Sequence, residues 1–194
     1  MIEHPNVIPI AVVVAVAVFL AREALDGWRR FRTNSRKLRA IRKLIAADCE
    51  RNNYAIGSIL GQVADIDAGL KNASVISIER TVSGLPRLAI REPDKEFGSS
   101  SPVPPLHTGN LEKYLFEAAS LDRTLFDLME QALDGLAEAR HVREGIIEYV
   151  SEDTAHLGSF ADFYAPRELN KSLEGLRNLY ANCTGEPLAA SRVR

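Results

Sequence analysis

The sequence predicts a mainly α-helical protein, in which an N-terminal transmembrane helix continues into a long helix, followed by a small β-hairpin and then a helical bundle. Three observations lead to this class. An uncharged apolar run occupies Val7–Ala21, and a strongly basic segment follows it. Apolar residues then recur three and four apart through most of residues 41–183, as on one face of a helix. Between these helical stretches, residues 74–91 alternate in the manner of strands.

The apolar run is interpreted as a retained membrane anchor. It has fifteen residues without a charge, and counting from Pro5 gives seventeen, the lower edge of what crosses about 30 Å of hydrocarbon as a helix. A cleaved signal peptide is disfavoured because residues 1–6 contain no Lys or Arg and Phe19 would stand at the −3 position of a cut after Ala21. A buried strand or core helix is disfavoured by the length of the run. We therefore expect a short extracytoplasmic tail at 1–6 and an anchor at 7–25.

The charges after the anchor predict its direction. Residues 22–43 contain nine basic and two acidic residues, whereas residues 1–6 contain no Lys or Arg, so the positive-inside rule places the C-terminal body in the cytoplasm. Within a predicted juxtamembrane helix at 26–45, five basic residues step by three and four along one face. We expect this face to bind anionic lipid headgroups; the alternative is an ordinary solvated face. The five residues are Arg29, Arg32, Arg36, Arg39 and Lys43.

The body beyond the basic segment is acidic. Residues 48–194 contain fifteen Lys and Arg against twenty-three Asp and Glu, a net charge of −8. This balance disfavours nucleic acid as a partner of the body. The two cysteines, Cys49 and Cys183, form no metal-binding or redox motif and are read as isolated reduced thiols.

A cytoplasmic helical domain is predicted over 46–183. Its first helix continues the long N-terminal one, and Gly57 and Gly61 on it would allow either self-association or ordinary bundle packing. Residues 74–91 predict a β-hairpin that turns at Ser83-Gly84. Residues 92–108 are rich in Pro and Ser and predict a linker without regular structure.

The C-terminal half predicts further helices. Apolar spacing from Leu111 to Val150 indicates one long helix with weak points at Gly135 and Gly145. A short helical segment follows Ser151, a last helix opens at Pro166 and ends at Gly185, and residues 184–194 form a tail.

Residues with the potential for chemistry are few. Glu138 with His141, and Asp153 with His156, have the i, i+3 spacing of a di-iron ligand pair, but the further inward carboxylates that such a site needs are not evident. No nucleophile, phosphate-loop or cofactor motif has the required spacing. Three aromatic residues in five form either an exposed partner-docking patch or the plug of a small core. They are Phe160, Phe163 and Tyr164.

The functional prediction is a non-enzymatic scaffold or regulatory module, anchored by a single pass in the inner (plasma) membrane of a bacterium with its body in the cytoplasm. The expected partners are a bilayer with anionic headgroups and an unidentified protein, or a second copy of the chain. No metal, cofactor or nucleic acid is expected. The alternatives are a ligand-sensing or signalling bundle, a membrane-active toxin or phage-type factor, and an enzyme. A scaffold predicts closely packed helices, whereas a sensor predicts a polar pocket inside the bundle.

Overall fold

The computed structural model describes residues 10–93, 98–151 and 154–189, and the chain divides into two compact units, 1–40 and 41–194. The predicted mainly helical class, with a small antiparallel sheet, is confirmed. The first helix, α1 (Ile10–Lys71), has 62 residues and runs through the boundary between the units. The long helix predicted after the apolar run is therefore present.

The described part of the first unit is the stretch of α1 from Ile10 to Ala40. Every residue from Ile10 to Leu25 is exposed. Within the described residues, no helix has an apolar stretch long enough to cross a membrane. The uncharged part of α1, Ile10–Ala21, reaches only about 18 Å at 1.5 Å per residue, against about 30 Å of hydrocarbon. The transmembrane helix predicted over 7–25 is therefore not supported, and its residues 7–9 lie outside the described part.

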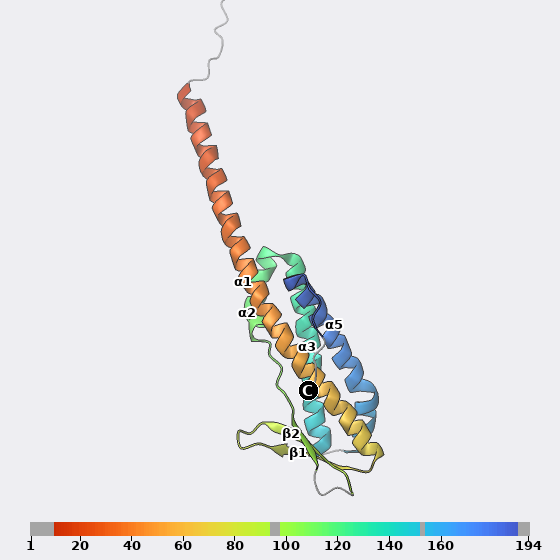
Figure 1. Ribbon diagram of the computed structural model, residues 1–194. Coiled ribbons are helices and arrows are strands. Elements are labelled where there is room, and N and C mark those ends of the chain that lie inside the picture. The colour runs from red at the N-terminus through yellow and green to blue at the C-terminus, as the bar shows by residue number, and fades with distance from the viewer. Residues whose placement is uncertain (1–9, 94–97, 152–153, 190–194) are drawn as a thin grey trace, which may run out of the picture. The chain divides into compact units, whose positions relative to one another are not determined.

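The second unit is a helical bundle. Besides α1 from Ile41 onward, it contains α2 (Gly109–Leu121), α3 (Arg123–Ser151), α4 (Thr154–Ser159), a π-helical turn η1 (Phe160–Tyr164) and α5 (Ala165–Thr184). Figure 1 shows α1, α3 and α5 side by side in this unit. Their facing stripes form a core of fully buried aliphatic and sulfur-containing side chains, as the helical spacing predicts. Among them are Ile45, Ile56, Ile59 and Ile66 of α1, Leu125, Met129, Leu136 and Ile146 of α3, and Leu169 and Leu176 of α5.

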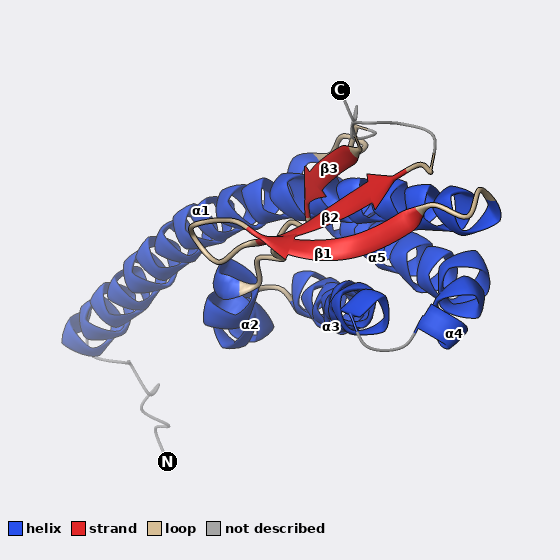
Figure 2. Ribbon diagram, turned by 90° about the horizontal axis from the view of Figure 1, so that it is seen from below, coloured by secondary structure: helices blue, strands red, loops and turns tan. Residues whose placement is uncertain are grey.

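A three-stranded antiparallel sheet covers one end of the bundle (Figure 2). The predicted hairpin is confirmed as β1 (Val75–Arg80) and β2 (Pro86–Arg91), with Ile78 opposite Leu88. A Cβ on Gly69 of α1 would lie 3.2 Å from a side-chain carbon of Ile76 and 3.4 Å from one of Ile90. The glycine therefore lets the sheet pack directly on the end of α1.

A third strand, β3 (Ser99–Pro102), lies inside the segment predicted to be an irregular linker, so that prediction is wrong for these residues. The strand pairs with β2, placing Ser100 opposite Ala89. Two features hold it there. A Cβ on Gly98 would lie 2.6 Å from the backbone oxygen of Ile90, so glycine is needed for the approach. In addition, Arg87 donates to the hydroxyl and backbone oxygens of Ser100 at 3.0 and 3.1 Å.

The helix predicted from Leu111 to Val150 is in fact two helices, which break at Asp122. One Asp122 carboxylate oxygen accepts from the backbone N–H of Leu125 at 3.1 Å and so caps the start of α3. The other accepts from Arg42 of α1 at 2.7 Å. The predicted weak points, Gly135 and Gly145, lie inside α3 instead.

The predicted end of the last helix at Gly185 is confirmed, whereas its predicted opening at Pro166 is not, because the chain is helical without a break from Thr154 through η1 into α5. Pro166 lies in the first turn of α5, where a missing N–H costs little. Gly185 terminates the helix with a left-handed φ of 79°, and its N–H donates to the Ala181 oxygen at 2.8 Å. The short helix predicted after Ser151 is present as α4.

Candidate functional site

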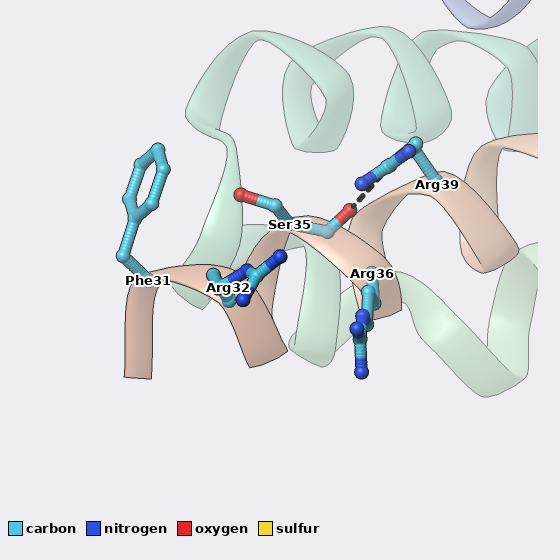
Figure 3. Close-up of a pocket in the computed structure, with 5 residues that line it drawn as sticks. All are labelled: Phe31, Arg32, Ser35, Arg36 and Arg39. Atoms are coloured by element: carbon cyan, nitrogen blue, oxygen red, sulfur yellow. Dashed lines mark hydrogen bonds between the residues drawn. The ribbon is translucent and has the colours of Figure 1, made fainter. Parts of the chain in front are cut away.

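The five basic residues predicted to face lipid headgroups are all exposed on α1. Four of them lie in the first unit and Lys43 lies in the second. An open hollow of about 610 Å³ runs along the part in the first unit, lined by Arg32, Arg36 and Arg39 together with Phe31 and Ser35 (Figure 3). The helical period puts these guanidinium groups on one side of the helix, where they form a cluster of positive charge. We call the residues Arg29, Arg32, Arg36, Arg39 and Lys43 the basic stripe.

The charges of the basic stripe are little neutralised by the described part of the protein. Arg29 lies 3.6 Å from Asp26, and both side chains are exposed, so the pair contributes little stability. Arg32 lies 4.7 Å from the centre of the Trp28 ring. Arg39 donates to the backbone oxygen of Ser35 at 3.3 Å, which Figure 3 marks. No described carboxylate pairs with Arg32, Arg36 or Arg39, so these groups are available to an external anion.

The apolar segment directly before the basic stripe is the second part of the site. Consecutive residues Val12, Val13 and Val14 are each about half exposed, as is Phe19 further on. Because consecutive residues of a helix point 100° apart, this apolar surface extends around the whole helix and is not confined to one face. This segment therefore leaves an apolar surface on every side of the helix in contact with solvent.

The three aromatic residues predicted as a partner contact divide into two roles. Phe160 is buried; a Cβ on Gly145 would lie 2.9 Å from its ring, and the centroids of the Phe160 and Tyr149 rings are 5.0 Å apart. Tyr164 is half buried, and burial raises the pKa of its hydroxyl. Phe163 is 73% exposed. The Phe160 ring therefore fills the contact between η1 and α3. Of the three aromatic residues, only Phe163 has a largely exposed ring.

The two carboxylate–histidine pairs do not come together as a metal site in the described residues. The Glu138 carboxylate accepts from the Tyr164 hydroxyl at 3.4 Å, and the His141 ring lies edge-on to the Tyr164 ring at 6.2 Å between centroids. Asp153 of the second pair lies outside the described residues. Across the described ranges, no group of three or more His, Cys, Asp or Glu residues is arranged to hold a metal ion.

Neither cysteine is activated. Burial raises the pKa of the Cys49 thiol well above its ordinary value and that of Cys183 to about 11. Because the thiolate is the nucleophile and the metal ligand, a raised pKa makes both groups poor at either role near neutral pH. Both are free thiols in the structure, but they are not isolated, because Cys183 is close enough to Cys49 to contribute to its raised pKa.

A row of buried polar side chains on α1 was missed by the sequence prediction. Asn52 donates to the backbone oxygen of His107 at 2.6 Å and accepts from its N–H at 2.8 Å. Gln62 donates to Ser101 and Pro102 at 2.9 and 2.8 Å. Asp48 accepts from the Asn110 side chain at 3.0 Å. These residues fix the segment 101–110 against α1.

A signal for this row was present in the sequence. The apolar stripe of α1 passes from Cys49 to Ile56 across Asn52 and Asn53, so polar residues occupy core positions. Buried polar groups need hydrogen-bond partners, and a neighbouring segment rich in proline has unpaired backbone carbonyls to offer.

Comparison of the chain with protein-family models, with curated proteins and with solved structures found no match. What this chain does must therefore be inferred from its own residues.

Proposed function

We propose that this protein is a membrane-tethered adaptor: the exposed apolar segment of α1 inserts into a lipid bilayer, the basic stripe binds anionic headgroups, and the helical bundle is presented to a protein partner. One observation carries the proposal. Twelve consecutive uncharged residues, Ile10–Ala21, are exposed on a helix and are followed within three turns by the basic stripe. Apolar surface beside clustered arginines is the chemistry of a bilayer interface.

The depth and side of insertion follow from the same residues. The described apolar segment is shorter than the hydrocarbon core, so we propose that it is anchored jointly by apolar burial and by its arginines. Trp28 and Phe31 lie at the level where aromatic side chains favour the headgroup region. The basic residues favour the anionic cytoplasmic leaflet, which places the body on the inner side of the plasma membrane.

An adaptor is favoured over a ligand sensor by the interior of the second unit. Three of the polar side chains buried there, Asp48, Asn52 and Gln62, are engaged by the segment 101–110, and two more, Glu168 and Ser172, lie along the hollow between α3 and α5. The hollow of about 560 Å³ between α3 and α5 is an open surface groove. Its charged lining includes Asp134, Glu138 and Lys171, which suits a polar protein contact more than a small apolar ligand.

Vesicle flotation of the full chain tests the proposal. We expect the protein to float with vesicles of phosphatidylcholine and phosphatidylglycerol. Val13→Asp with Val16→Asp should abolish flotation, because charges in the apolar segment oppose insertion. The control is Val75→Asp, which changes a valine on β1 that is at least as exposed and should float normally. The proposal fails if the unmodified chain remains at the bottom of the gradient; a stable dimer in that case would assign the apolar segment to a second copy.

The lipid charge provides a second comparison. Arg32→Glu, Arg36→Glu and Arg39→Glu together should weaken partitioning onto anionic vesicles by about 3 kcal/mol or more, roughly a hundredfold, at about 1 kcal/mol per basic residue. Vesicles of phosphatidylcholine alone should show little change. Equal loss on both kinds of vesicle would contradict a role in headgroup binding.

A further inference from the structure

A hollow of about 370 Å³ opens on the second unit between α3 and the short elements α4 and η1. Its described lining contains three aromatic rings, two imidazoles and one hydroxyl, and no Lys, Arg, Asp or Glu side chain. The residues are His141 and Tyr149 of α3, His156 and Ser159 of α4, and Phe160 and Tyr164 of η1. We call it the aromatic hollow, to distinguish it from the hollow with a charged lining between α3 and α5.

Three of these rings form a continuous aromatic wall. The centroid of the Phe160 ring lies 5.0 Å from that of Tyr149 and 5.8 Å from that of Tyr164, and the two tyrosine rings are tilted to it by 60° and 33°. In η1 the N–H of Ala165 donates to the Phe160 oxygen five residues earlier, which is the hydrogen bond of a π-helical turn. Such single turns inside α-helices are rare and are frequent at functional sites. Tyr149 and Tyr164 are only half buried, so part of each ring is open to the hollow.

Carboxylates lie beside the tyrosine at one end of this wall. The Tyr164 hydroxyl donates to the Glu138 carboxylate at 3.4 Å. Burial and the charges of Glu138 and Glu168 raise the pKa of this hydroxyl, and Arg167 acts in the opposite direction. Arg167 is itself paired with Glu168 at 2.7 Å, so the charge of Glu138 is left without a described cation against it.

The charged residues of α3 near His141 are arranged in the same sense. Arg140 and Arg143 are engaged elsewhere, since they donate to Thr108 and to the Pro104 oxygen at 3.4 and 3.0 Å. Two carboxylates, three and seven residues after His141 and so on its face of the helix, share a hollow with one arginine. They are Glu144 and Glu148, with Arg80. Among these described neighbours of the aromatic hollow, carboxylates therefore outnumber the guanidinium groups that face them.

We propose that the aromatic hollow binds a small organic cation that carries a trimethylammonium group. Aromatic rings attract a cation through their negative faces, and the surrounding carboxylates favour the same charge. The lining selects the kind of cation. A primary ammonium or a guanidinium brings several N–H donors that need acceptors, and the described lining offers no carboxylate, whereas a trimethylammonium group has no N–H to satisfy. The site lies in the second unit alone and does not depend on the proposed membrane tether.

Calorimetric titration of the full chain, kept in a maltoside detergent, tests the site with choline as the probe. We expect choline to bind about fivefold or more tightly than dimethylbutanol, its uncharged isostere, in which carbon replaces the quaternary nitrogen. Phosphocholine should bind more weakly than choline, because the carboxylates repel its phosphate. This comparison distinguishes a free cation from a lipid headgroup.

Three variants locate the binding. Tyr164→Leu removes a ring of the wall and should weaken choline binding by about fivefold or more, whereas Tyr164→Phe keeps the ring and should retain most of the binding. The matched control is Tyr54→Leu, which removes a tyrosine of α1 that is 60% exposed and should leave binding unchanged. Unchanged far-ultraviolet circular dichroism confirms the fold of each variant.

Several results would overturn the proposal. They are absence of choline binding to the unmodified chain, equal binding of choline and its uncharged isostere, tighter binding of phosphocholine, and equal losses in Tyr164→Leu and Tyr54→Leu. The comparison of ligands uses the unmodified chain, so it is decisive even if Tyr164→Leu does not fold. Vesicle flotation measures the membrane tether separately, so failure of one proposal is distinguishable from failure of the other.

Discussion

Replacing Asn52 by alanine is predicted to loosen the segment 101–110 from α1. Asn52 is fully buried, and its amide makes two hydrogen bonds to the backbone of His107, at 2.6 and 2.8 Å. Alanine removes both, leaving a backbone donor and a backbone acceptor to find water. At about 0.5–1.5 kcal/mol for each bond, the free energy of unfolding should fall by about 1–3 kcal/mol.

The neighbouring Asn53 is the matched control. It makes one hydrogen bond, from its amide to the backbone oxygen of Ala189 at 2.9 Å, so Asn53→Ala should cost about 0.5–1.5 kcal/mol, half as much. Urea unfolding followed by circular dichroism at 222 nm measures both variants. Limited proteolysis should cut near residues 101–108 faster in Asn52→Ala and not in Asn53→Ala. Equal losses in the two variants, with no change in proteolysis, would refute the role assigned to Asn52.

Three further changes have defined outcomes. Gly98→Ala should lower stability in thermal unfolding, because its Cβ would lie 2.6 Å from a backbone oxygen of β2, whereas Gly61→Ala on exposed α1 meets nothing within 4 Å and should stabilise by up to about 1 kcal/mol. Asp122→Ala should lower the urea midpoint by removing both the cap of α3 and an ion pair, a loss of about 1–3 kcal/mol; an unchanged midpoint would contradict this. Burial raises the pKa of Cys183 to about 11 and raises that of Cys49 too, so the unfolded thiols ionise first and stability should fall as pH rises from about 9 to 11. Urea midpoints at about pH 8 and about pH 10 measure this, and a drop that Cys183→Ser leaves unchanged would exclude that thiol as a cause.

Helices and the hairpin were predictable because their signals are local. The three-to-four spacing of Ile56, Ile59 and Val63 fixes one buried face of α1 without reference to any other segment. Gly185 ended α5 as predicted, because a glycine after an apolar period can adopt the left-handed conformation of a C-cap. The turn at Ser83-Gly84 was predictable for the same reason, because its signal is local and does not depend on how the strands pair.

Features that depend on distant pairing were not predictable. β3 is a serine-rich segment with no strand pattern, and it becomes a strand because the edge of β2 offers hydrogen bonds to it. The second partner of Asp122 at the helix break is Arg42, eighty residues earlier in the chain, and no local signal indicates that pairing. The basic stripe could be predicted from its spacing, because a charged helix face is exposed without needing a contact from another segment. Its binding to lipid is a proposal.

Insertion of the apolar segment of α1 into lipid is the central claim, and amide hydrogen exchange of residues 10–21 tests it most directly. In water these amides belong to an exposed helix outside the bundle core, so they should exchange rapidly compared with those of α3. With anionic vesicles present, we expect strong slowing across the segment 10–21 and little change in α3, because amides surrounded by hydrocarbon have no water to exchange with. Exchange of residues 10–21 at the same rate with and without vesicles would contradict it.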